Sequence, residues 1–310
     1  MRGRSVNRLI LQSLSNTVRR FQWRHPPRLP NWRQQTYRNL SSYFKFLVGG
    51  GTIYCLSGVA LTVNAAEANP LHSSQHKLGK KEEERAIAEA DSLFSLYQVD
   101  RLYEFLKKFE HTDSAQLCWR LARAACDKAK NCNPKSEERK KLMYEGFQHA
   151  KRSLELSDKC GSCHKWYALM LNYVGDYEGN KQKIQYSYIV QDHFMKAIEL
   201  NPKDATSMYC LGQWCYFFAD MSWYIQKIAA IIFSSPPTST FEEALKYFLM
   251  AEETDPNFYS MNHLMLAKTY LKMNQKDKAR SYLLKARDFP VISPDDKQAH
   301  TESIELLQNL

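Results

Sequence analysis

The chain has 310 residues, of which 44% are hydrophobic and 25% are charged. This length allows a large core, and this hydrophobic content is higher than that of a chain disordered throughout. The formal net charge is +10, from 43 basic and 33 acidic residues. Residues 1–66 hold ten of the basic residues and no acidic one, so residues 67–310 carry 33 basic and 33 acidic side chains. A neutral body argues against nucleic acid as a partner.

Residues 1–45 form a basic, acid-free tail of the kind that directs proteins to mitochondria. Its apolar residues recur every three or four positions and would share one face of a helix. Pro26, Pro27 and Pro30 would end that helix. These apolar residues are Val6, Leu9, Ile10, Leu14, Val18 and Phe21. The alternative is a basic tail that binds acidic surfaces.

Residues 46–66 are an uncharged stretch, long enough to cross a bilayer core of about 30 Å. Three consecutive glycines, Gly49 to Gly51, and several polar residues make it only moderately apolar. We expect a membrane anchor here, with a weakly apolar linker as the alternative. A polar linker follows over residues 67–81.

From residue 82 onward, apolar residues recur at spacings of three and four, which predicts helices. The clearest repeated unit comprises Leu266, Ala267, Tyr270, Ala279, Leu283, Ala286 and Pro290. Similar units comprise Leu211, Gly212, Ala244, Phe248, Ala251 and Pro256, then Trp166, Leu169, Tyr173, Val190, Phe194, Ala197 and Pro202, and a weaker set of Leu121, Ala122, Ala150 and Leu154. Pro256 and Pro290 are 34 residues apart, the length of one tetratricopeptide repeat. The sequence therefore predicts an all-α, tetratricopeptide-like solenoid of helical hairpins over residues 82–310.

One repeat carries an insertion of about 20 residues, because Pro202 and Pro256 are 54 residues apart. Thr240 and Glu243 have the spacing of a capping box, which would restart a helix after the insertion. The inserted segment is apolar, and we expect it either to pack on the solenoid or to form an apolar lip that faces a partner or a lipid tail. The lip would consist of Trp223, Ile228, Ile232 and Phe233.

A stack of helical hairpins has an extended concave surface on which peptides, helices or lipids can bind. We predict a partner-binding surface made of Tyr167, Leu171, Tyr209, Gln213, Tyr216, Lys268 and Lys272. The alternative for most of the aromatic residues is the core between repeats. The chain has no glycine-rich phosphate loop, nucleophile elbow or His-Glu-x-x-His motif, so we expect no catalytic residue and no cofactor.

The eight cysteines are dispersed through a chain large enough to build its own core, which favours a reducing compartment over a disulfide framework. Cys160-Gly-Ser-Cys163-His164 matches the attachment pattern for c-type haem. We interpret it as the turn before the helix of Trp166, and a haem or redox protein remains a distant alternative. A zinc site has four possible thiol ligands but lacks a second tight pair. Its ligands would be Cys126, Cys132, Cys160 and Cys163.

Between Ser222 and Leu245 the sequence resembles the regulator of microtubule dynamics family, in the order Trp, Lys-Ile-Ala, Phe, Pro-Pro, Ser-Thr and Glu-Glu-Ala-Leu. The segments 164–168 and 117–125 fit the same resemblance, which extends over roughly residues 82–310. The length and the basic start are most similar to the first member of that family.

The resemblance implies a tetratricopeptide-like fold, association with microtubules or tubulin-associated proteins, and a role at spindle microtubules and poles. It also implies a mitochondrial outer-membrane relative whose repeat domain contacts lipids and tethers organelles. No catalytic residues belong to the family pattern. We therefore expect a non-enzymatic scaffold in the cytoplasm and on the spindle, and the alternative is a lipid-binding or tethering module anchored at mitochondria, as the tail independently suggests.

Overall fold

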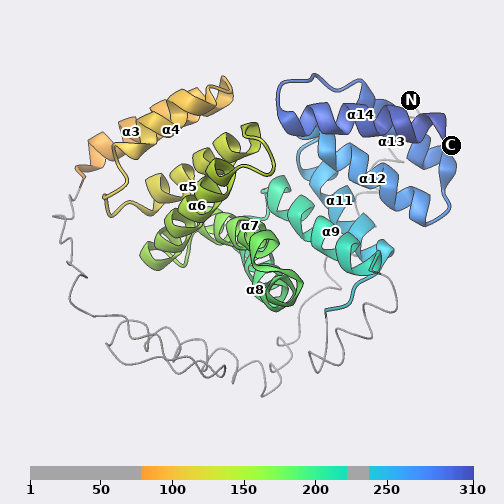
Figure 1. The fold of residues 1–310 in the computed structure, drawn as a ribbon, viewed down its shortest axis with the longest axis horizontal. Coiled ribbons are helices and arrows are strands. Elements are labelled where there is room, and N and C mark those ends of the chain that lie inside the picture. Colours follow the sequence, from red (N-terminus) through yellow and green to blue (C-terminus); the bar gives the residue numbers. More distant parts are fainter. Residues whose placement is uncertain (1–77, 222–236) are drawn as a thin grey trace, which may run out of the picture. The chain divides into compact units, whose positions relative to one another are not determined.

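Helical hairpins make up the part of the chain that the structure describes (Figure 1). The computed structural model describes residues 78–221 and 237–310, and the elements in these two ranges are α-helices. Labelled as in Figure 1, they are α3 (Lys80–Ser95), α4 (Val99–Lys107), α5 (Ala115–Asn131), α6 (Glu137–Leu156), α7 (Gly161–Glu178), α8 (Asn180–Leu200), α9 (Ala205–Ala219), α11 (Phe241–Thr254), α12 (Ser260–Lys272), α13 (Lys276–Arg287) and α14 (Pro294–Gln308).

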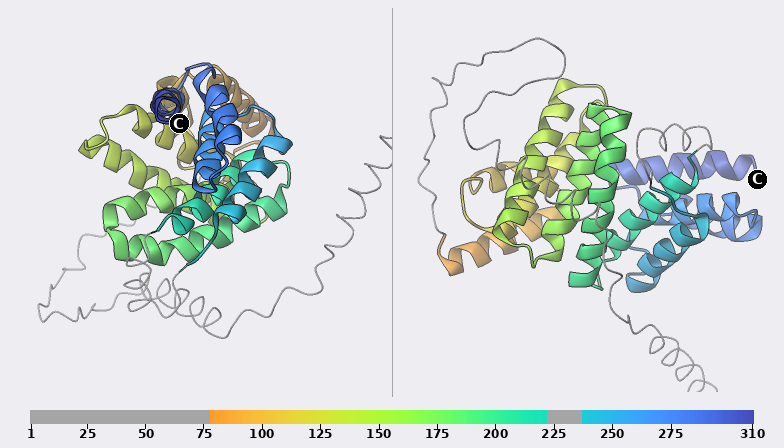
Figure 2. Two further views of the ribbon diagram at one scale, coloured as in Figure 1. Left: turned by 90° about the vertical axis from the view of Figure 1, so that its right-hand side faces the viewer. Right: turned by 90° about the horizontal axis from the view of Figure 1, so that it is seen from below.

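Four hairpins follow one another along the chain: α5 with α6, α7 with α8, α9 with α11, and α12 with α13. Each hairpin packs on the next through α6 with α7, α8 with α9, and α11 with α12, and the views of Figure 2 show the paired helices side by side. The helices α3 and α4 precede this stack and contact α5, while α14 follows it and contacts α12 and α13. These hairpins coincide with the four predicted repeat units, so the all-α, tetratricopeptide-like prediction is confirmed.

Small residues allow the two helices of each hairpin to approach closely. Ala267 of α12 and Ala279 of α13 are both fully buried. Gly212 of α9 faces Phe248 of α11, and a Cβ atom added at this glycine would lie 2.7 Å from two ring carbons of Phe248. The small positions of the repeat pattern therefore mark the contact lines between helices.

The helix boundaries follow capping and proline signals in the sequence. α8 ends at Leu200 before Pro202, and α11 ends at Thr254 before Pro256. At the start of α11, the Thr240 hydroxyl accepts a hydrogen bond from the Glu243 amide at 3.1 Å, and the Glu243 carboxylate accepts one from the Thr240 amide at 3.2 Å. The predicted capping box is therefore present.

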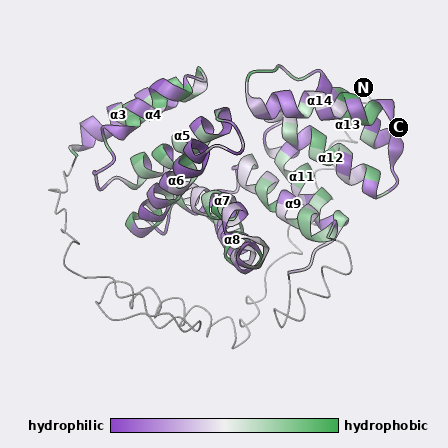
Figure 3. Ribbon diagram, viewed as in Figure 1, coloured by the Kyte–Doolittle hydropathy of each residue, from purple (hydrophilic) through white to green (hydrophobic). Residues whose placement is uncertain are grey.

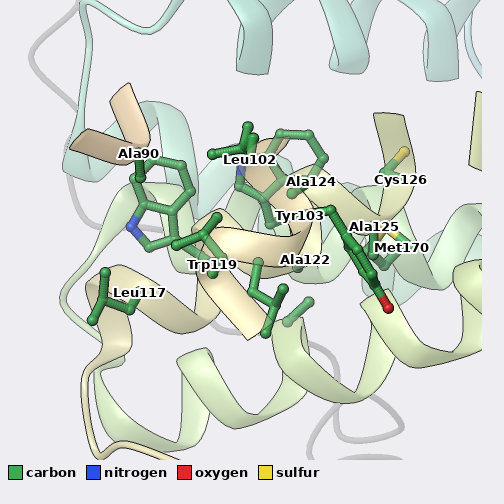
Figure 4. Packing of buried hydrophobic residues seen from close by; sticks show 14 of the residues in the cluster. Ala90, Leu102, Tyr103, Leu117, Trp119, Ala122, Ala124, Ala125, Cys126 and Met170 are labelled. Carbon is green, nitrogen blue, oxygen red and sulfur yellow. The ribbon is translucent and has the colours of Figure 1, made fainter. Parts of the chain in front are cut away.

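The core forms three successive clusters along the stack. The first joins residues of α3 to α7, as Figure 4 shows for Ala90, Leu102, Trp119 and Met170. The second joins α7 to α13, and the third joins α12, α13 and α14. Ten of the 15 residues of α9 are buried, and Figure 3 shows apolar residues interspersed with more polar ones along this helix. This helix is therefore the centre of the second cluster.

Several sequence predictions lie outside the described residues: the tail of residues 1–45, the stretch 46–66, most of the linker 67–81, and the apolar lip of Trp223, Ile228, Ile232 and Phe233. Among the helices of residues 78–221 and 237–310, none combines the length and the apolar composition needed to cross a membrane.

Candidate functional site

A cavity of about 640 Å³ lies between α7, α8 and α9. Its walls are mainly apolar. They include Leu169 of α7, Ile184, Val190 and Phe194 of α8, and Trp214 and Phe218 of α9. The Trp214 indole Nε1 donates a hydrogen bond to the Ser187 carbonyl oxygen at 2.9 Å, so the polar atom of this ring is already bonded inside the protein. The cavity has the size and lining that suit an apolar ligand.

Two charged side chains, Lys183 and Asp220, are among the residues that line this cavity. Lys183 of α8 forms an ion pair with Asp176 and lies 5.5 Å from the ring centroid of Phe217. Asp220 forms an ion pair with Lys272 of α12 at 2.6 Å. An apolar wall with an ionic border fits a molecule that has an apolar body and a polar end.

The predicted partner-binding surface is only partly brought together by the structure. Gln213 and Tyr216 both line the cavity, and the Tyr216 ring packs edge-on against Phe241 with centroids 5.4 Å apart. Lys272 lies beside the cavity through its ion pair with Asp220. These three residues lie around one site.

Two residues of that predicted surface lie in the core, which corrects the prediction for them. Leu171 is 3% exposed and Tyr209 is 5% exposed. The Tyr209 ring contacts Tyr259 edge-on at 5.1 Å and Phe248 at 5.9 Å, so the next hairpin covers it. Neither side chain is available to a partner on the surface, because stacking of successive hairpins buries this face of the first helix.

The remaining two residues make contacts within the chain. Tyr167 packs between Phe147 and His193, with ring centroids 5.7 Å and 4.7 Å away. Lys268 of α12 forms an ion pair with Glu302 of α14. Both residues therefore connect helices of the stack, and Lys268 helps to hold α14 in place.

A polar cluster that the sequence analysis missed joins α14 to the beginning of the stack. The Asp295 carboxylate at the start of α14 accepts hydrogen bonds from Lys130 Nζ of α5 at 2.7 Å and from the Tyr259 hydroxyl at 2.5 Å. Burial raises the pKa of Asp295, but the Lys130 ammonium and the two hydrogen bonds outweigh it and hold that pKa below its ordinary value. The partners are 165 residues apart, so no local pattern signals their contact.

Asp127, one turn before Lys130 on α5, has the opposite electrostatic balance. Burial, together with the nearby Asp295 charge, raises the pKa of Asp127 to about 6, against the lowering effect of Lys130 and Arg123. The cluster therefore contains one carboxyl group with a lowered pKa, Asp295, and one with a raised pKa, Asp127.

A second polar contact fixes α3 on α5. Arg120 donates two hydrogen bonds to the Asp91 carboxylate, at 2.9 Å from Nε and 2.7 Å from one terminal nitrogen, and its guanidinium lies 4.1 Å from the centroid of Trp119. The Arg123 guanidinium lies 3.6 Å from the ring centroid of Phe94. The bidentate pair and the stacked cations make this surface of α5 an internal contact.

The Cys160-Gly-Ser-Cys163-His164 motif lies at a helix start, which corrects its interpretation as a turn that precedes the helix. Cys160 is the N-cap of α7, and Gly161 to His164 form its first turn. Both His164 ring nitrogens have partners, Nδ1 with His193 Nδ1 and Nε2 with the Asp158 carbonyl oxygen, each at 2.8 Å. The imidazole therefore has no free nitrogen to bind a haem iron.

The zinc alternative also fails for the described part of the chain. Within residues 78–221 and 237–310, no three His, Cys, Asp or Glu side chains come together in a way that would hold a metal ion. Cys126 of α5 and Cys163 of α7 are both buried in the first core cluster, where they pack as small apolar residues.

Comparison with known proteins gives a family match. The profile described as regulator of microtubule dynamics protein 1-3 matches residues 86–310. Regulator of microtubule dynamics protein 1 of Mus musculus is 48% identical over 235 residues, which cover 76% of this chain and 76% of that protein. The Homo sapiens protein of the same name is 53% identical over 189 residues, 61% of this chain and 60% of that protein. Regulator of microtubule dynamics protein 3 of Xenopus laevis is 34% identical, covering 64% and 43%.

Among solved structures, a thermophilic TPR protein of Thermus thermophilus superposes with a TM-score of 0.49 at 14% identity, over 73% of this chain and 99% of that chain. The TPR protein YrrB, described with an unusual peptide-binding site, superposes with a TM-score of 0.38 at 17% identity, over 72% and 90%.

Proposed function

The chain belongs to the regulator of microtubule dynamics family, and from that premise we propose that its helical repeats form a non-enzymatic scaffold that associates with microtubules or with tubulin-associated proteins. The observation that carries the proposal is the extent of the family match, residues 86–310, which spans the described helical hairpins. Stacked hairpins offer an extended binding surface, and a scaffold role needs no reactive centre.

The basic helix α13 supplies a surface suited to acidic tubulin chains. This helix carries five basic residues and one acidic residue, a net charge of 5 − 1 = +4, although residues 67–310 as a whole are neutral. Lys276, Lys278, Arg280 and Lys285 are exposed on it, and Lys278 Nζ lies 5.4 Å from the Tyr270 ring centroid. A helix with a local excess of positive charge attracts an acidic partner even on a neutral domain.

Co-sedimentation with polymerised microtubules tests this proposal. We expect the double change Lys278→Glu and Arg280→Glu to weaken binding at least several-fold and to reduce its dependence on salt. The matched control is Lys140→Glu with Lys141→Glu on α6, which makes the same charge change at two other exposed lysines. Equal loss of binding in both variants, or in neither, would argue against α13 as the contact.

For location, we propose the cytoplasm and the spindle, with a mitochondrial pool directed by residues 1–66. A tag at the C-terminus distinguishes these when mitochondria, cytosol and microtubules are separated. A tag that protease can reach on intact mitochondria is compatible with microtubule binding. A tag that is fully protected inside mitochondria would contradict direct microtubule regulation by that pool.

The apolar cavity favours a second candidate function, a lipid-binding or organelle-tethering module at mitochondria. Its volume of about 640 Å³, its apolar walls and the ion pair of Asp220 with Lys272 beside it fit an acyl chain with a polar headgroup. The microtubule proposal does not require this cavity, so the two functions can be tested separately.

Native mass spectrometry of the purified chain tests the lipid candidate. We expect phospholipid to co-purify with the wild type, and Ile184→Trp to remove it because Ile184 lines the cavity. Met195→Trp is the control, since Met195 is 47% exposed and does not line the cavity. Lipid retained equally by both variants would place the lipid elsewhere, and circular dichroism would confirm that both remain folded.

A further inference from the structure

Two cysteines one helical turn apart at the start of α7 have no part in the surfaces described above. Cys160 is the N-cap residue and Cys163 the third residue of the helix, and the Cys163 amide donates a hydrogen bond to the Cys160 carbonyl at 3.0 Å. The two residues therefore lie next to each other in the first turn of α7, and the Cys163 thiol lowers the pKa of Cys160. Cys-x-x-Cys at a helix N-terminus is the arrangement that redox-active protein dithiols use.

The surroundings of the two sulfur atoms differ in a way that suits a reactive and a resolving thiol. Cys160 is half-buried, and its sulfur accepts a hydrogen bond from Gln116 Nε2 at 3.6 Å. The Cys163 side chain is fully buried, with its sulfur 4.0 Å from the Ala115 carbonyl oxygen. A reagent from solvent therefore reaches Cys160 first, and Cys163 lies behind it.

The pKa directions agree with this geometry. The hydrogen bond from Cys163, opposed by burial and aided by the backbone amides, lowers the pKa of Cys160 below its ordinary value. The same hydrogen bond and burial raise the pKa of Cys163. Cys132 is the other half-buried thiol in the described ranges, and burial raises its pKa. Thiolate character is therefore concentrated on Cys160.

We propose that Cys160 and Cys163 form a reversible disulfide by exchange with a small-molecule disulfide such as oxidised glutathione. The Cys160 thiolate attacks one sulfur of oxidised glutathione, a mixed disulfide forms, and one glutathione thiolate leaves. Cys163 then loses its proton to solvent, its sulfur attacks Cys160 Sγ, and the second glutathione leaves as thiolate. Two protein thiols lose two electrons, and one glutathione disulfide gains them and becomes two thiols.

Mass spectrometry of the folded full-length chain, after incubation with excess oxidised glutathione and alkylation of the remaining thiols, tests the proposal. We expect an internal disulfide between Cys160 and Cys163 in the wild type, which reduced glutathione reverses. Cys163→Ser should instead accumulate glutathione on Cys160, because the resolving thiol is missing. Cys160→Ser should leave residue 163 without glutathione.

Cys132→Ser is the matched control, since it removes the other half-buried thiol and should leave the Cys160–Cys163 disulfide unchanged. At neutral pH, iodoacetamide should modify Cys160 at least several-fold faster than Cys132 in the wild type. Glutathione added equally to Cys132 and Cys160, or a Cys160–Cys163 disulfide that forms only after urea unfolds the chain, would overturn the proposal. Thermal melts of each variant establish that the folded protein was tested.

Discussion

At the scale of single residues, the contact between Gly212 and Phe248 determines how closely α9 and α11 pack. Alanine is favoured over glycine within a helix by about 1 kcal/mol, which alone would stabilise Gly212→Ala. The added Cβ atom would lie 2.7 Å from ring carbons of Phe248, which is fully buried. We expect the clash to dominate and Gly212→Ala to lower the free energy of unfolding by about 1–2 kcal/mol.

Urea unfolding followed by circular dichroism measures this effect. Gly79→Ala is the control, because nothing lies within 4 Å of the Cβ position at that glycine before α3. A Gly212→Ala protein as stable as its parent would show that the second core cluster can open without cost, contrary to the packing described above.

Trp166 presents the complementary case of a large residue at a predicted repeat position. It is 9% exposed and belongs to the first core cluster. We expect Trp166→Ala to lower the free energy of unfolding by about 3–5 kcal/mol, because the removed ring leaves a cavity. Val291→Ala, at a residue 53% exposed, should change it by no more than about 0.5 kcal/mol. An unchanged melting temperature for Trp166→Ala would place this ring on a binding face.

At the scale of elements, the polar cluster around Lys130 makes the attachment of α14 dependent on pH. The lowered pKa of Asp295 contributes stability above its ordinary value of 3.8, and this contribution is lost as pH falls through the lowered folded value. The raised pKa of Asp127 acts oppositely: its contribution is present below 3.8 and is lost as pH rises through about 6. Asp295→Asn should therefore destabilise the chain at neutral pH, and Asp127→Asn should stabilise it there.

Unfolding midpoints recorded from about pH 3 to pH 7 separate the two variants. The deficit of Asp295→Asn should shrink toward the acid end, while the advantage of Asp127→Asn should grow between about pH 4 and pH 7. If the two variants changed stability in the same direction at neutral pH, the opposite electrostatic roles of these carboxylates would be wrong.

The hairpins and their boundaries could be predicted from sequence because their signals are local. Ala267 with Ala279 and Thr240 with Glu243 are small-residue and capping patterns, and the structure confirms both. The contact of Lys130 with Asp295 was not predictable, since it depends on how the stack curves over 165 residues of chain. Tyr209 was misplaced on the surface, because Phe248 and Tyr259, whose rings cover it, come from other parts of the stack.

The candidate site shows the same limit. The sequence analysis placed Gln213 and Tyr216 on one partner-binding surface, and both residues line one cavity in the structure. The cavity itself arises between two hairpins, and its α8 wall, with Ile184 and Phe194, had no signal beyond the repeat pattern. Which face of a repeat remains open depends on its neighbours, and a single repeat does not encode this.

At the scale of the whole molecule, the net charge and the core clusters of the described residues lie in different parts of the chain. All three core clusters consist of residues between 78 and 310, whereas residues 1–66 carry the whole net charge of +10. Deleting residues 1–66 should therefore leave the cooperative thermal transition of the repeats in place while the net charge falls to zero. Calorimetry of residues 67–310 beside the full chain checks the first expectation. Weaker retention of residues 67–310 than of the full chain on a cation-exchange column checks the second. Loss of the cooperative transition would show that residues 1–66 contribute to the folded core.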